Sequence, residues 1–218
     1  MRPARLRLAE VGQLLSPTEQ YYLNGEKYDW VTDPRRLERR FHQKRSDQIV
    51  QLFHQTFTPH LRREALFLDL GCGTGLISRQ LVATRLICAD LNRWNLQRAR
   101  QRTPSYDYVQ CSAHALPFVQ RFSGALITEV LEHLERPWEA ASELSRVIRP
   151  GGILIGSVPS RSLVWKLRRL LSTSHPHSEP FHHNYTKKQL FGLLNGFRTM
   201  RAFRSVYGMS IVFVARTG

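Results

Sequence analysis

Three glycines spaced two residues apart give the strongest chemical signal in the sequence. Gly71, Gly73 and Gly75 lie in the segment LDLGCGTG, after a short apolar run and before residues at helical spacing. Glycine has no side chain, so the backbone of such a loop can approach a ligand closely, and the first N–H groups of a following helix lack partners within it. The loop therefore predicts a site for a nucleotide-like ligand.

The spacing around these glycines disfavours two common nucleotide loops. A dinucleotide-binding loop needs glycine or alanine at the sixth position of G-x-G-x-x-G, and counting from Gly71 that position is Leu76. The Gly-Lys-Ser/Thr of a Walker loop is also missing. Asp90 ends the next predicted strand, where its carboxylate can accept from both hydroxyls of a ribose, or can cap the helix that begins near Arg93.

The segments around these residues predict an α/β domain. Between residues 65 and 160, strand-like and helix-like patterns alternate, which is typical of a parallel sheet with crossover helices. The predicted strands are 65–70, 85–90, 106–111, 124–128, 152–158 and an antiparallel 208–215, and the predicted helices are 34–57, 76–82, 94–102, 137–148 and 186–194. We therefore expect an N-terminal helical extension over 1–60 and one α/β domain over 61–218.

Composition limits the class of protein and its partners. The 42% of hydrophobic residues excludes a disordered tail, and the net charge of +15 favours anionic partners or a solvated arginine-rich surface. No apolar run approaches the roughly 20 residues of a membrane span, and the start lacks the apolar stretch of a secretory signal, so we expect a cytoplasmic protein. Three cysteines without CxxC spacing (Cys72, Cys88 and Cys111) predict reduced core residues.

Taken together, these segments resemble the class I S-adenosylmethionine-dependent methyltransferases. The resemblance rests on LDLGCGTG, Asp90, AHALPF at 113–118, TEVLEHL at 128–134 and RVIRPGGILIGSVP at 146–159. The resemblance covers most of the chain. Within the family, the chain resembles the branch that includes the ubiquinone-biosynthesis O-methyltransferases. This resemblance implies a Rossmann-like, seven-stranded, mostly parallel sheet with helices on both faces and an antiparallel last strand.

The resemblance also implies how the cofactor binds. The methionine part would lie over the glycine loop, the ribose on Asp90, and the adenine beside Leu91 and the Ser112-Ala113 turn. The implied cofactor residues are Asp69, Gly71, Cys72, Gly73, Gly75, Asp90, Leu91, Ser112, Ala113 and Glu129. Ser112 departs from the family pattern, where an acidic residue commonly accepts from the adenine amino group, so we expect weaker adenine discrimination.

The E-x-x-E-H sequence formed by Glu129, Glu132 and His133 has two interpretations in this family. In one, which resembles the ubiquinone-biosynthesis enzymes and the 2′-O-methyltransferases of small RNAs, all three hold a divalent metal such as Mg²⁺, with His182 or His183 completing the shell. In the other, Glu129 faces the cofactor pocket and His133 is a general base or simply packs. The predicted catalytic residues are His133 and Glu129.

The segment 160–185 is predicted to form a lid over the acceptor site or an interfacial insert. Its RSLVWKLRRLL sequence has leucines at helical spacing beside basic residues, a pattern that also suits contact with an anionic membrane. The prediction is O-methylation of a small or lipid-linked metabolite by a cytoplasmic enzyme, with or without peripheral membrane contact. The alternatives are an RNA methyltransferase, for which no appended nucleic-acid-binding module is visible, and a catalytically silent cofactor-binding scaffold.

Two further expectations concern the N-terminal extension. The aromatic group Tyr21, Tyr22, Tyr28 and Trp30 either packs the extension against the sheet or closes over the cofactor mouth. A basic residue of the long helix, Lys44 or Arg45, is a candidate partner for the cofactor carboxylate.

Overall fold

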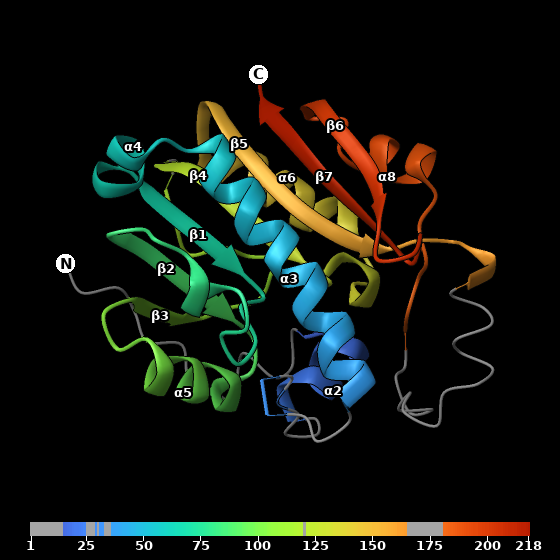
Figure 1. The fold of residues 1–218 in the computed structure, drawn as a ribbon, viewed down its shortest axis with the longest axis horizontal. Helices are drawn as coiled ribbons and strands as arrows, with labels where there is room; N and C mark the ends of the chain where they lie inside the picture. Colours follow the sequence, from blue (N-terminus) through green and yellow to red (C-terminus); the bar gives the residue numbers. More distant parts are fainter. Residues whose placement is uncertain (1–14, 25–28, 30, 33–35, 120, 165–180) are drawn as a thin grey trace.

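The computed structural model describes residues 15–24, 29, 31–32, 36–119, 121–164 and 181–218, with only the backbone described at 36–38 and 199–200. A seven-stranded sheet runs through its centre in the order β3-β2-β1-β4-β5-β7-β6 (Figure 1). The strands are β1 Leu66–Leu70, β2 Arg85–Asp90, β3 Asp107–Gln110, β4 Phe122–Thr128, β5 Ile148–Pro159, β6 Phe197–Ser205 and β7 Ser210–Thr217. Strand β7 pairs antiparallel with β5 and β6, and the other neighbouring strands pair parallel. The predicted mostly parallel Rossmann-like sheet is therefore confirmed.

Helices cover both faces of this sheet. They are α2 Pro17–Asn24, α3 Arg36–Thr56, α4 Pro59–Glu64, α5 Arg93–Arg102, α6 Pro137–Val147 and α8 Lys187–Leu193, with two 3-10 turns, η1 Ser78–Gln80 and η2 Leu131–His133. In Figure 1, α3 crosses the front of the sheet while α6 and α8 lie behind it. Successive residues of β1 point to opposite faces: Phe67 packs in the cluster with α3, and Leu68 in the cluster with α6 and α8.

One sequence prediction about the elements is wrong, and one strand has no counterpart among the predicted elements. The segment 76–82 forms no α-helix but only the tight turn η1, because Gln80 and Leu81 donate their N–H groups three residues back, to Ile77 and Ser78. A short apolar run cannot distinguish a helix from a buried turn by periodicity. Strand β6 was not located, since its FRTMRAFRS sequence is arginine-rich, as suits the edge of a sheet.

The strand order fixes where a ligand can bind. It reverses between β1 and β4, so the crossovers leave in opposite directions, and open α/β sheets bind ligands at the carboxyl ends of strands at such a reversal. The glycine loop follows β1 at this edge, and the Glu129 segment follows β4. Among the helices described, none combines the length and the hydropathy that crossing a bilayer requires.

Candidate cofactor and methyl-transfer site

The glycine loop turns sharply at the carboxyl end of β1. Gly71, Gly73 and Gly75 have φ values of 72°, 54° and 85°, in the left-handed region that favours glycine. A Cβ atom on Gly71 would lie 2.2 Å from Cγ2 of Val130, so the loop and the segment after β4 are in close contact. Larger side chains at this position would therefore displace the loop or the segment after β4.

Asp90, the last residue of β2, holds this loop in place through a hydrogen bond. One of its carboxylate oxygens accepts from the N–H of Gly73 at 2.8 Å, and the other accepts from the N–H of Asn92 at 2.8 Å and from Nδ2 of Asn95 at 3.2 Å. Burial raises the pKa of Asp90. Asn92, whose side chain accepts from Trp94 and Asn95, caps α5, so the helix-capping interpretation of Asp90 is wrong.

A second carboxylate, that of Asp69, is buried near Asp90. Asp69 is only 1% exposed, and within the described part of the chain neither of its carboxylate oxygens has a hydrogen-bond partner. Burial and the negative charge of Asp90 raise the pKa of Asp69 to about 7. Two buried carboxyl groups beside a backbone cradle favour a ligand that carries positive charge.

Helix α2 brings a further carboxylate to this edge. Glu19 accepts from the hydroxyl of Ser112, after the end of β3, and lies 3.0 Å from Nδ1 of His114. Its second oxygen accepts from the N–H of Ser16, whose hydroxyl in turn accepts from the N–H of Glu19, which forms a capping box. Burial raises the pKa of Glu19, but hydrogen bonds from His114 and Ser112 outweigh burial and lower that pKa to about 2.

Three further contacts join the N-terminal segment to the glycine loop, to α5 and to the loop after β2. Asp29 accepts from the hydroxyl of Thr74 at 2.7 Å and forms an ion pair with Arg102 of α5 at 2.5 Å. The carbonyl oxygen of Tyr22 accepts from Nδ2 of Asn92 at 2.8 Å. The N-terminal segment therefore contacts the loops that follow β1, β2 and β3.

Tyr22 also reaches the segment after β4. Its hydroxyl lies 2.7 Å from Nδ1 of His133, and the two rings are 5.0 Å apart. Of the predicted aromatic group, Tyr22 thus closes over the carboxyl edge of the sheet, while Tyr28 and Trp30 lie outside the described residues.

Glu129 follows β4 in an unusual backbone conformation. Its φ is 53°, in the left-handed region that a residue with a side chain rarely adopts. The N–H of Glu129 donates to the carbonyl oxygen of Ser157, and its carboxylate accepts from the hydroxyl of Ser157 at 2.8 Å. The other carboxylate oxygen lies 3.0 Å from Nη1 of Arg45 in α3. Lys44 instead lies over the ring of Tyr207.

These contacts set Glu129 apart from the other two residues of the predicted metal-ligand set. The carboxylate of Glu129 contacts Ser157 and Arg45, whereas the group that can hold a metal consists of Glu132, His133 and His182, with ligand atoms within 4.8 Å of one another. Glu132 is 1% exposed, and the rings of His133 and His182 are 5.2 Å apart. A divalent metal at this second group stays a prediction.

The remaining predicted cofactor residues lie at or below the same edge. Leu91 and Ala113 are half-buried in the segments after β2 and β3, next to Asp90 and Ser112. The side chain of Cys72 is buried in the core cluster beneath α3, so only its backbone is available to a ligand. Cys72, Cys88 and Cys111 are free thiols, as predicted.

Sequence reasoning missed one functional candidate, Glu19. This residue comes from α2, far along the sequence from the strands that carry the rest of the site. The only local signal for Glu19 is the S-x-x-E spacing from Ser16, which predicts the start of a helix but not the contact with Ser112.

Comparisons with known proteins agree with this geometry. Residues 68–156 match the family described as a methyltransferase domain. The chain is 31% identical to the ubiquinone biosynthesis O-methyltransferase of Cereibacter sphaeroides over 54% of this chain and 51% of that protein. It is 32% identical to the malonyl-[acyl-carrier protein] O-methyltransferase of Salmonella typhimurium over 48% of this chain and 45% of that protein. The chain thus spans about half the length of these relatives.

A solved structure shows the same fold over most of the chain. The magnesium protoporphyrin IX methyltransferase of Synechocystis PCC 6803, solved with bound SAH, superimposes with a TM-score of 0.71 at 18% identity, covering 87% of this chain and 91% of that one. The matched family segment runs from β1 to β5 and therefore includes the glycine loop, Asp90 and Glu129. Over residues 68–156 the chain is therefore similar to a methyltransferase domain, and its fold is that of the solved methyltransferase.

Proposed function

We propose that this protein transfers the methyl group of S-adenosylmethionine to an oxygen atom of a small or lipid-linked metabolite. The observation that carries the proposal is the glycine loop at the strand-order reversal, fastened by Asp90 and lying beside the buried carboxyl group of Asp69. This arrangement suits a cationic nucleoside, because the backbone can approach the ligand while two acids offset its positive charge.

The described residues fit this cofactor part by part. S-adenosylmethionine supplies a methyl group already activated by a sulfonium, so the protein mainly has to align the acceptor and exclude water. Asp90 is positioned to accept from the ribose hydroxyls, and Gly71 to Gly75 to lie under the methionine part. Arg45, 7% exposed, is paired with Glu129 at this edge and is the candidate partner for the cofactor carboxylate.

Oxygen is the favoured acceptor atom because the two relatives described above are named as O-methyltransferases. The names also favour small-molecule or carrier-bound acceptors over RNA. Where the 160–185 segment begins, Leu163 and Val164 are 80% and 45% exposed, which suits a lid or a peripheral membrane contact. Residues 165–180 of that segment lie outside the described chain.

The test measures S-adenosylhomocysteine release by the full chain against extract fractions separated into small-molecule, lipid and RNA pools. We expect turnover with the small-molecule or the lipid pool, and turnover with RNA alone would contradict the proposed acceptor. Parallel assays with a chelator test a divalent metal at Glu132, His133 and His182, because loss of turnover that added Mg²⁺ restores would support it.

We further propose that Glu19 supplies the carboxylate that Ser112 does not provide. Its buried oxygen already accepts from Ser112, beside the turn where the adenine is expected. Replacing Glu19 by alanine should weaken S-adenosylmethionine binding about tenfold in calorimetry, since one charge-assisted hydrogen bond is lost. The double variant E19A/S112D should recover most of that loss.

Ser16→Ala is the matched control for this prediction. It breaks the capping box of α2 but leaves the Glu19 carboxylate, so we expect binding within about twofold of the natural chain. If S16A weakened cofactor binding as much as E19A, the role of Glu19 would be limited to holding α2 in place.

A further inference from the structure

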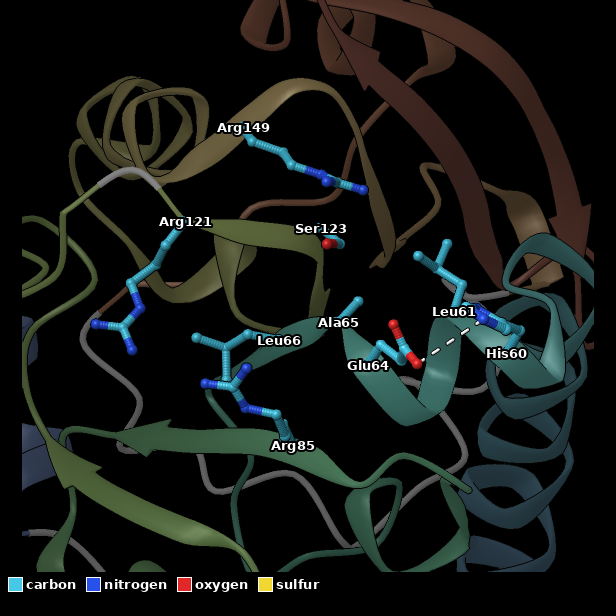
Figure 2. Close-up of a pocket in the computed structure, with 9 residues that line it drawn as sticks. All are labelled: His60, Leu61, Glu64, Ala65, Leu66, Arg85, Arg121, Ser123 and Arg149. Atoms are coloured by element: carbon cyan, nitrogen blue, oxygen red, sulfur yellow. Dashed lines mark ion pairs between the residues drawn. The ribbon is translucent and has the colours of Figure 1, made fainter.

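A second hollow lies at the opposite edge of the sheet, where the strands begin. Its volume is about 400 Å³, and it is bordered by α4 and by the starts of β1, β2, β4 and β5 (Figure 2). Arg85 is the first residue of β2, Arg121 directly precedes β4, and Arg149 is the second residue of β5. The residues of the glycine loop do not line this hollow, so among the described residues it is separate from the cofactor edge.

The fold itself gathers these three arginines. The strand order β2-β1-β4-β5 places their strands within three neighbour spacings, or about 14 Å. Figure 2 shows the three arginines on separate segments around the hollow, with Ser123 and Ala65 between Arg149 and Arg85. Ala65 and Ser123 are buried and line the hollow, whereas the three arginines are exposed.

The guanidinium groups of Arg85, Arg121 and Arg149 have no hydrogen-bond or ion-pair partner within the described part of the chain. Two arginines near these strands are instead held by partners: Arg62 of α4 donates to two carbonyl oxygens, and Arg146 pairs with Glu143. Among the described residues, Glu64 is the one acid that lines the hollow. Its carboxylate lies 3.8 Å from Nε2 of His60. Three positive charges and their N–H donors are therefore available to a ligand.

Guanidinium groups of this number and spacing suit phosphoryl groups. The planar fork of arginine matches the oxygens of phosphate and binds them with charge-assisted hydrogen bonds. Repulsion among the like charges is relieved when an anion binds between them. A volume of about 400 Å³ lies in the range of small-molecule sites.

We propose that this hollow binds a phosphorylated small molecule through Arg85, Arg121 and Arg149. Because the arginines come from strands spread over about 14 Å, two linked phosphoryl groups can contact more of them than a single phosphate can. The site is independent of methyl transfer, since it lies at the other end of the strands and uses none of the residues assigned to the cofactor.

Calorimetric titration of the full chain with inorganic pyrophosphate at low ionic strength tests this site. We expect one pyrophosphate per chain, bound more tightly than inorganic phosphate. The double variant R85Q/R121Q should bind pyrophosphate at least about tenfold more weakly, because two of three guanidinium partners are lost. Both side chains are exposed, so the variant should fold, which its thermal denaturation and an unchanged affinity for S-adenosylmethionine would verify.

The matched control is R100Q/R204Q, which removes two other exposed arginines from α5 and β6 and the same net charge. Pyrophosphate affinity within about twofold of the natural chain would support a defined site. Equal weakening in the two double variants would overturn the proposal in favour of a diffuse positive field. The absence of detectable pyrophosphate binding would also overturn the proposal. If, in that case, a single-stranded oligonucleotide bound and its binding depended on Arg85 and Arg121, the hollow would be assigned to nucleic acid instead.

Discussion

Replacing Asp90 by alanine should weaken S-adenosylmethionine binding by at least about 100-fold, or about 2.8 kcal/mol. The carboxylate accepts from the N–H of Gly73 and thereby holds the glycine loop in its left-handed conformation. We propose that it also accepts from the ribose hydroxyls. Each hydrogen bond to a charged group contributes about 1.5–3 kcal/mol, so losing both kinds exceeds any single contact at this edge. Calorimetric titration of the variant with the cofactor measures the effect.

Two companion variants separate binding from folding. Asp90→Asn keeps the shape and one acceptor oxygen, so its loss of affinity should lie between those of the natural chain and D90A. Asp107→Ala removes an exposed carboxylate at the start of β3, away from the cofactor edge, and should leave the affinity for S-adenosylmethionine unchanged. Cofactor affinity in D90A within about threefold of the natural chain, with an intact thermal transition, would show that neither contact of Asp90 contributes much to cofactor binding.

The central strands and their carboxyl-end loops could be predicted because their signals are local. The runs ALFLDL and RLICAD are apolar and buried on both faces, and each ends in residues with a recognisable task, the glycine loop and Asp90. Strand β6 has no such signal, since Arg198, Arg201 and Arg204 interrupt its apolar pattern at the sheet edge. Its place in the sheet is set by pairing with β7.

The residues of the site could be predicted only where they lie within one continuous segment of the sequence. Glu19 meets Ser112 across 93 positions of sequence, and Arg45 of α3 meets Glu129 after β4. Periodicity and spacing describe neighbours along the chain, so they give no information on such pairs. Glu129 shows the limit clearly: the E-x-x-E-H spacing grouped it with Glu132 and His133, but its left-handed backbone and its contacts with Ser157 and Arg45 take it into a different set.

His133→Ala should lower turnover by about 100-fold or more at saturating cofactor, because we propose that its imidazole removes the proton from the acceptor hydroxyl. His133 lies at the carboxyl end of β4, its side chain is 23% exposed, and its Nδ1 is 2.7 Å from the hydroxyl of Tyr22. That contact orients the ring and leaves Nε2 toward Glu132 at 3.8 Å. S-adenosylhomocysteine release with the active acceptor pool measures the loss, and cofactor affinity should remain within about threefold of the natural chain.

Two neighbouring variants distinguish a general base from a metal ligand. Tyr22→Phe removes only the orienting hydroxyl, so a general base predicts a smaller loss of turnover, about tenfold or less, with unchanged cofactor affinity. His182→Ala removes a residue that matters only if a metal is held, since His182 otherwise packs on the ring of His133 at 5.2 Å. A base therefore predicts that H182A keeps most of its turnover and that added imidazole partly restores H133A. Equal losses in H182A and H133A, together with sensitivity to a chelator, would instead assign His133 to a metal, because a base acting alone has no need of the second histidine.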